Sequence, residues 1–217
     1  SADASWKADK LHQLLAAHDC LPSSIVEIGC GSGAILAALR GYYPQVSLAG
    51  FDIAPETSRF WSDASVRGIR FELADYLSLD EPVPDLILVL DVLEHLGNPW
   101  EFLARLRHRS KLVAIHFPLD LSAVSVLRER PLLQVRDKVG HLHYFTRGLA
   151  LSLLEESGFE IVEARYTGAA LDAPQRSFKT RVAGWARRLA YAVDRDFGAR
   201  LLGGETLMVL ARPRSVN

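Results

Sequence analysis

Ser24-Ile-Val-Glu-Ile-Gly-Cys-Gly-Ser-Gly33 predicts a buried strand that runs directly into a glycine-rich turn. The run Ala-Ile-Leu-Ala-Ala-Leu, which begins at residue 34, then predicts a helix. Glycines can adopt positive φ and let a ligand approach the backbone, and a helix N-terminus presents unpaired N–H groups. This stretch therefore indicates a binding site for a nucleotide-like ligand.

Glu27 stands two residues before the first glycine of this turn. The spacing Gly29-x-Gly31-x-x-Ala34 also fits the dinucleotide fingerprint, in which a helix N-terminus holds a pyrophosphate. A carboxylate beside the turn disfavours a pyrophosphate and favours a cationic, amino-acid-like ligand such as S-adenosylmethionine. The turn alone does not distinguish a dinucleotide from S-adenosylmethionine.

Composition narrows the class of protein. The chain has 217 residues, of which 49% are hydrophobic, and a formal net charge of −1. This suits one α/β domain over residues 1–217, with no overall attraction to nucleic acid and no apolar run long enough for stable membrane insertion.

Cys20 and Cys30 lack a metal-type spacing, and a disulfide at Cys30 would obstruct the turn, so we expect a reducing, cytoplasmic setting. Because Met208 is the only methionine, we expect the chain to begin inside a longer product. Oligomeric state is not indicated.

Strand and helix patterns alternate along the chain. We expect strands at 24–28, 46–51, 69–73, 85–90, 111–117, 159–164 and 205–211, and helices at 6–18, 34–39, 55–66, 99–107 and 146–157. Such alternation implies a parallel sheet covered by helices on both faces.

Two insertions interrupt the alternation, at about 119–145 and 167–204. Insertions after strands fall at the functional edge of such a sheet, so we expect them to form a substrate cover. The second carries arginines and apolar residues at helical spacing, which predicts a basic amphipathic helix. This helix is interpretable as a lid over an anionic substrate, a membrane-surface helix, or an element packed on the domain.

Acidic residues end the first four strands or lie beside their ends. In an open parallel sheet these ends meet at one edge, where ligands bind, so Glu27, Asp52, Asp75 and Asp91 are expected to gather there. Asp52 is placed to accept hydrogen bonds from ribose hydroxyls, and Ile53 offers an apolar face to an adenine. Asp75 can accept from the adenine amino group, and Tyr76 can pack either on the ring or in the core.

Four segments together resemble the motifs of class I S-adenosylmethionine-dependent methyltransferases. They are residues 26–33, 50–53, 73–76 and 85–96, and the resemblance covers about residues 24–165. It implies a Rossmann-like, doubly wound sheet of seven mostly parallel strands with the last strand antiparallel, and a small-molecule acceptor above the methyl group. Residues 93–96 and 141–146 further resemble the branch of quinone-biosynthesis O-methyltransferases.

The resemblance implies a role for each matched residue. The methionine part of S-adenosylmethionine would contact Glu27, Gly29, Cys30, Gly31, Ser32 and Gly33, the ribose Asp52, the adenine Asp75, and the sulfonium Asp91, Val92 and His95. S-adenosylhomocysteine would be the product. Asp91, Glu94 and His95 fall on one side of a helical turn. Because hard cations usually bind more oxygen ligands than these residues offer, no metal site is expected.

Methyl transfer needs a base only for some nucleophiles, and for a phenol or hydroxyl acceptor a histidine can take the proton. His116, His141 and His143 reach the functional edge and are the candidate catalytic residues, although each also has a structural interpretation. We therefore expect a small-molecule methyltransferase, acting on oxygen before nitrogen or carbon. Two alternatives stay open: a non-catalytic module that binds S-adenosylmethionine or S-adenosylhomocysteine, and an NAD-dependent oxidoreductase.

Overall fold

The computed structural model describes residues 2–65, 68–168 and 190–215. Its centre is one seven-stranded sheet in the order β3-β2-β1-β4-β5-β7-β6. The strands are β1 (Ser24–Ile28), β2 (Ser47–Asp52), β3 (Arg70–Leu73), β4 (Leu86–Leu90), β5 (Val113–Leu119), β6 (Phe159–Tyr166) and β7 (Glu205–Pro213). The first five pair in parallel, and β7 runs antiparallel to both β5 and β6. The expected doubly wound sheet with an antiparallel last strand is confirmed.

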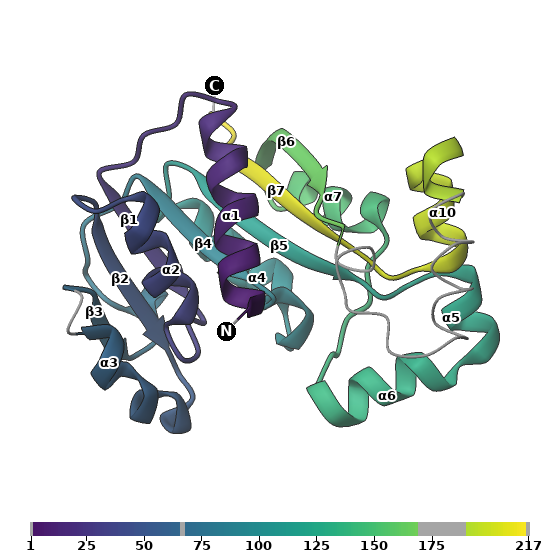
Figure 1. Cartoon of the computed structure of the whole chain (residues 1–217), viewed down its shortest axis with the longest axis horizontal. Helices are drawn as coiled ribbons and strands as arrows, with labels where there is room; N and C mark the ends of the chain where they lie inside the picture. The colour runs from purple at the N-terminus through teal and green to yellow at the C-terminus, as the bar shows by residue number, and fades with distance from the viewer. Residues whose placement is uncertain (1, 66–67, 169–189, 216–217) are drawn as a thin grey trace.

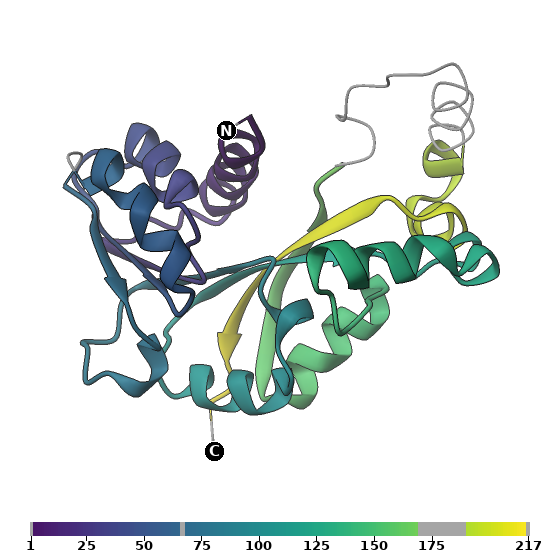
Figure 2. The ribbon, with the colours of Figure 1, turned by 90° about the horizontal axis from the view of Figure 1, so that it is seen from below.

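Helices cover both faces of the sheet (Figures 1 and 2). α1 (Ala2–Ala16), α2 (Ala34–Tyr42) and α3 (Trp61–Ser65) lie on one face, and α4 (Pro99–Arg107) and α7 (Arg147–Glu156) on the other. The strongly apolar central strand β4 contributes side chains to the cores on both faces of the sheet. Leu86 and Leu88 pack toward α1 and α2, and Ile87 and Val89 pack toward α4 and α7. The alternating side chains of one strand thus bridge two hydrophobic cores.

Side-chain caps begin two helices on the second face. The Asn98 side chain accepts a hydrogen bond from the Glu101 N–H at 3.1 Å, directly before Pro99 opens α4. The Thr146 hydroxyl accepts from the Leu149 N–H at 3.3 Å and begins α7. Each side chain satisfies an N–H group that the first turn of a helix leaves without a partner.

Some elements differ from the sequence expectation. Residues 55–65 form a 3₁₀ segment, η1 (Pro55–Phe60), followed by the short α3. Strand β5 continues through Pro118, where we expected it to end. β4 pairs with β5 only as far as His116, so Pro118 lies where β5 has one strand partner, and its missing N–H is tolerated there.

The first expected insertion contains two helices, α5 (Ala123–Arg128) and α6 (Arg130–Val139). They lie beyond the end of β5, together with α10 (Arg195–Leu202), which contacts α5 (Figure 1). The basic amphipathic helix expected in the second insertion falls largely at 169–189, outside the described residues. Within the described ranges, no helix is both long enough and apolar enough to span a bilayer.

The glycine turn after β1 requires its glycines. Gly29 and Gly33 have φ of +74° and +73°, and Gly33 directly precedes α2. A Cβ at Gly29 would lie 2.6 Å from a methyl of Val92, and one at Gly33 would lie 2.5 Å from the Phe71 ring. Positive φ and close packing thus both exclude a larger residue here.

Candidate functional site

The strand-end acids lie at the carboxyl edge of the sheet, where Asp52 and Asp75 line a cavity. Asp52 ends β2, Asp75 follows β3, and Asp91 follows β4, as the sequence predicts for parallel strands. The cavity holds about 260 Å³ and is lined by Ile28, Gly29, Phe51, Asp52, Ile53, Ala74, Asp75, Tyr76, Val92, Leu96, Phe102 and Arg105. We call it the edge cavity. Its lining combines an apolar surface with two carboxylates, which suits a ligand with a flat apolar part and hydroxyl groups.

Asp52 connects the glycine turn to the end of β2. One oxygen of its carboxylate accepts a hydrogen bond from the Gly31 N–H at 2.8 Å, and the other accepts from the Ala54 N–H at 2.9 Å. An ionised carboxylate has about four acceptor positions, so two remain for hydroxyl donors of a ligand. Ile53, beside it, is 74% exposed and offers an apolar contact at the cavity wall.

Asp75 and Tyr76 form the far side of the edge cavity. The Asp75 carboxylate accepts from the Leu77 N–H, the Ser78 hydroxyl and Arg105. Burial opposes its ionisation, but these hydrogen bonds outweigh burial and lower the pKa of Asp75. Tyr76 packs its ring in the core against Phe51, 4.9 Å between centroids, and only 1% of the residue is exposed. Its core packing limits the aromatic surface that it presents to a ligand.

Glu27 is a fully buried carboxyl group inside β1. It pairs in register with Gly50 and Leu88, and its Oε2 atom has no hydrogen-bond partner within the described part of the chain. Burial raises the pKa of Glu27 to about 8, although the nearby positive charge of Lys7 opposes the rise. An unpartnered carboxylate oxygen beside the glycine turn is suited to receive a positively charged group.

A second cavity lies on the α1 side of Asp91. It holds about 270 Å³ and is lined by Asp3, Trp6, Lys7, Asp91, Glu94, His95, His116, Pro118, Val139, His141 and Thr206. We call it the histidine cavity. Val92 lines the edge cavity and Asp91 lines this one, so consecutive residues form a wall of each.

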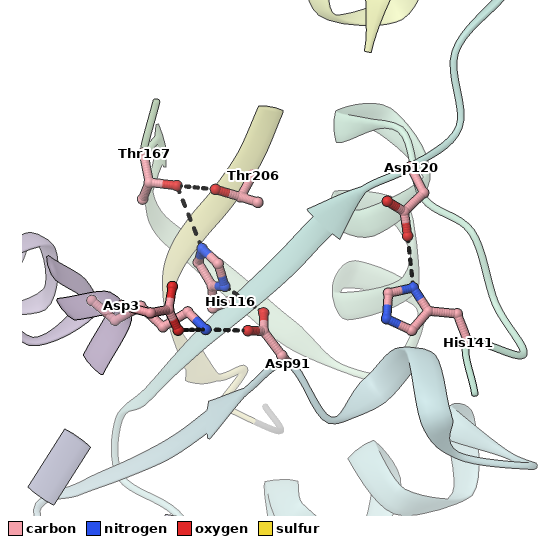
Figure 3. A network of polar contacts seen from close by, with 8 residues as sticks. Asp3, Asp91, His116, Asp120, His141, Thr167 and Thr206 are labelled. Carbon is pink, nitrogen blue, oxygen red and sulfur yellow. Dashed lines mark hydrogen bonds and ion pairs between the residues drawn. The ribbon is translucent and has the colours of Figure 1, made fainter. Parts of the chain in front are cut away.

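Asp91 is the centre of a network of polar contacts in the histidine cavity (Figure 3). Its carboxylate meets Lys7 Nζ at 2.5 Å through one oxygen and His116 Nδ1 at 2.5 Å through the other. Its backbone has φ of +54°, a strained conformation for a residue other than glycine. Burial opposes ionisation, but His116 and Lys7 hold the pKa of Asp91 well below its usual range. Asp91 is therefore an ionised acceptor.

The negative charge of Asp91 determines which ring nitrogen of His116 carries the proton. Because Asp91 accepts at Nδ1, a neutral His116 carries its proton on that nitrogen and leaves the Nε2 lone pair free. Nε2 faces the Thr167 hydroxyl at 3.4 Å, and Thr167 contacts Thr206, as Figure 3 shows. The longer contact at Nε2 leaves this nitrogen able to accept a proton from another hydroxyl.

The other two candidate histidines lie in different places. His141 lines the histidine cavity, and its Nδ1 meets the Asp120 carboxylate at 2.7 Å. His143 donates from Nε2 to the Leu96 carbonyl at 2.9 Å and lines neither of the two cavities. The structure thus brings His116 and His141 together and separates His143 from them.

Of the remaining residues predicted from the sequence, only some line a cavity. His95 lines the histidine cavity, whereas Glu27, Cys30, Gly31, Ser32 and Gly33 line neither. Cys20 and Cys30 are both free thiols.

Several residues of the histidine cavity were not anticipated. No sequence pattern indicated Asp3, Lys7 and Thr206, which line the cavity, or Asp120 and Thr167, which contact its histidines. A lysine in an N-terminal helix carries no sequence signal that separates it from a solvated surface residue.

Two buried acids predict how stability depends on pH. Burial, together with the charge of Asp91, raises the pKa of Glu94 to about 8, as burial raises that of Glu27. Between the ordinary value of 4.5 and about 8, the folded protein holds two protons that the unfolded chain has lost. The free energy of unfolding is therefore expected to fall as pH rises through this window, by up to about 1.4 kcal/mol per pH unit for each group.

Urea unfolding at several pH values measures this slope. Glu94→Gln and Glu27→Gln should each flatten it, whereas Glu155→Gln, on the solvent side of α7, should leave it unchanged. A stability that rises between pH 5 and pH 8 in the native sequence would contradict the assignment.

Comparison with known proteins identifies relatives of the chain. A family model described as "Methyltransferase domain" (Methyltransf_23) matches residues 3–164. Trans-aconitate 2-methyltransferase from Methylobacterium nodulans is 36% identical over 88 residues, which are 39% of this chain and 33% of that protein. The chain therefore spans about a third of the length of this curated relative.

Solved structures share the fold at low sequence identity. The plantazolicin methyltransferase BpumL, in complex with a monoazolic desmethylPZN analog and SAH, has a TM-score of 0.59 at 16% identity, over 98% of this chain and 83% of that one. The [4+2]-cyclase SpnF has a TM-score of 0.58 at 18% identity, over 96% of this chain and 82% of that one. Proteins named for different reactions thus share this fold.

Proposed function

Because the chain belongs to the methyltransferase domain family, we propose that it transfers a methyl group from S-adenosylmethionine to an oxygen of a small-molecule acceptor. One observation carries the proposal: a cavity suited to a nucleoside adjoins a cavity that holds a histidine base, with Val92 and Asp91 as consecutive wall residues. The arrangement would place the cofactor on one side of this wall and the acceptor on the other.

The residues of the edge cavity fit the chemistry of S-adenosylmethionine. The free acceptor positions of Asp52 suit ribose hydroxyls, and exposed Ile53 suits an adenine face. Gly29 presents backbone without a side chain to the cavity, and the unpartnered oxygen of Glu27, beside the glycine turn, suits a cationic amino-acid part. Cys30, Gly31, Ser32 and Gly33 would support this part through the backbone of the turn. When bound, the cofactor supplies an electrophilic methyl group.

Asp91 and His116 would prepare the acceptor for methyl transfer. Ionised Asp91 holds the His116 ring by Nδ1, and Nε2 would take the proton of the acceptor hydroxyl. Placement of the acceptor oxygen in the histidine cavity, in line with the methyl group, would supply much of the remaining acceleration. His141 would contribute as a second contact to the acceptor, and His143 as a residue that anchors the adjoining loop.

The alternatives differ in what they require. Family membership favours a methyl donor over NAD as the ligand of the glycine turn. A module that binds S-adenosylmethionine without transferring methyl needs the edge cavity but no base, so the buried Asp91–His116 pair favours an enzyme. We retain the quinone-biosynthesis branch as a proposal for the subgroup, on residues 93–96 and 141–146. We also propose a single domain over residues 1–217, with no nucleic-acid partner and a cytoplasmic location.

Methyl transfer is tested with a labelled donor. Incubation of the protein with S-adenosylmethionine labelled on its methyl group and a metabolite extract is expected to yield a labelled small molecule, with S-adenosylhomocysteine formed in equal amount. Chromatography with mass detection identifies the methylated atom. Cofactor binding without label transfer would instead support the binding module, and stabilisation against heat by NAD but not by S-adenosylhomocysteine would overturn the cofactor.

A further inference from the structure

Three hydrogen-bond acceptors converge in the histidine cavity, away from the Asp91–His116 pair. They are a carboxylate oxygen of Glu94 and ring nitrogens of His95 and His141, and these atoms lie within 4.8 Å of one another. All three residues line the cavity, and the two rings meet edge to face at 5.0 Å between centroids. The proposed methyl transfer does not use Glu94 or His95.

The rest of the fold orients both rings in the same way. His141 Nδ1 meets the Asp120 carboxylate at 2.7 Å, and His95 Nδ1 meets the Gly140 carbonyl at 3.2 Å. Both partners are acceptors, so each neutral ring carries its proton on Nδ1 and leaves Nε2 as a free acceptor. When Glu94 is ionised, the cluster offers lone pairs and no donor. Burial keeps a proton on Glu94 near neutral pH, and a bound positive charge would favour its release.

Glu94 is the buried member of the cluster. It has no exposed surface, and neither of its carboxylate oxygens has a hydrogen-bond partner among the described residues. Its backbone carbonyl accepts from the N–H groups of Leu142 and His143 at 2.7 and 3.1 Å, which holds the His141 segment against it. A buried carboxylate that lacks any donor is costly unless a ligand supplies one.

We propose that Glu94, His95 and His141 form a subsite for an ammonium group of the methyl acceptor. This inference rests on the proposed function, because it assigns the acceptor to the histidine cavity. An ammonium group offers three N–H donors, and acceptors about 2.9 Å from its nitrogen in tetrahedral directions are about 4.7 Å apart. The spread of the three atoms accommodates this arrangement.

The remaining lining of the cavity favours an organic cation over a bare metal ion. Trp6, Pro118 and Val139 add apolar surface, which a hydrocarbon body would cover. The charge of Lys7 is met mainly by Asp3 and Asp91, so it offsets the charge of Glu94 only in part. The acceptor is therefore a molecule that carries a hydroxyl group and, at some distance from it, a positively charged amine.

A matched pair of probes tests the subsite without turnover. Tyramine and 4-ethylphenol share a ring and a hydroxyl group and differ in the amine, and each is titrated by calorimetry into protein saturated with S-adenosylhomocysteine. Tyramine is expected to bind about 10- to 100-fold more tightly, as a hydrogen-bonded charge requires. Glu94→Gln, which keeps the shape of the side chain, should remove this preference, and Glu155→Gln on the surface of α7 should retain it.

Several outcomes would overturn the ammonium assignment. Equal affinity for the two probes would do so, as would no binding of either at millimolar concentration, or a preference that survives in Glu94→Gln. Stoichiometric binding of Zn²⁺ that depends on Glu94 and is not displaced by tyramine would replace it with a metal site. Binding of S-adenosylhomocysteine, measured first in the same samples, separates failure of this subsite from failure of the proposed cofactor.

Discussion

Replacement of His116 by glutamine is expected to lower kcat/KM by about 10²- to 10⁴-fold, the range typical for removal of a general base. The ring is 1% exposed, and Asp91 orients it through Nδ1. Glutamine keeps polar atoms of similar reach but cannot accept a proton at neutral pH. The acceptor would then lose its base while the edge cavity keeps its lining. Initial rates of methyl transfer, measured with the acceptor found in the labelling experiment, give the effect.

The pH profile distinguishes a base from a structural histidine. The pH dependence of kcat/KM should differ between the native protein and His116→Gln, because only the native protein has a general base at this position. His108→Gln, at the exposed C-terminal cap of α4, should leave both rate and profile unchanged. Binding of S-adenosylhomocysteine should be equal in all three proteins. A rate within a few-fold of native in His116→Gln would remove His116 from the reaction.

Asp52→Ala is expected to weaken cofactor binding by at least about 100-fold. The ribose would lose hydrogen bonds to a charged acceptor, each worth about 1.5–3 kcal/mol, and the glycine turn would lose its tie to β2. The second effect arises because the Gly31 and Ala54 N–H groups both donate to this carboxylate. Calorimetric titration with S-adenosylhomocysteine measures the loss directly, without need of an acceptor.

Two further variants separate the contributions of Asp52. Asp52→Asn keeps one oxygen for the backbone, so it should retain more of the turn and lose mainly the ribose contacts. Asp63→Ala, an exposed acid in the nearby α3, should bind the cofactor normally. Circular dichroism should show all three variants folded. An affinity for S-adenosylhomocysteine equal to native in Asp52→Ala would exclude its assignment to the ribose.

Local sequence patterns predicted the positions of the strand-end acids. Asp52, Asp75 and Asp91 follow strands that alternate with helices, and parallel strands end at one edge of a sheet, so their proximity follows from chain order. The caps at Asn98 and Thr146 were also readable, because they depend on side chains within three residues. The helices α5 and α6 were not, since their short apolar patterns did not stand out within an expected insertion.

The sequence by itself determined the sheet, the glycine turn and the acids beside it, because hydrophobic periodicity and backbone geometry are local properties of the chain. Only the tertiary structure decided the contents of the histidine cavity. Lys7 reaches Asp91 from 84 positions away, and Asp120 contacts His141 from 21 positions away. Such contacts depend on how α1 and the segment after β5 pack against the sheet edge. No spacing in the sequence encodes that packing, so the base, its ionised partner and the unpartnered Glu94 became recognisable only in three dimensions.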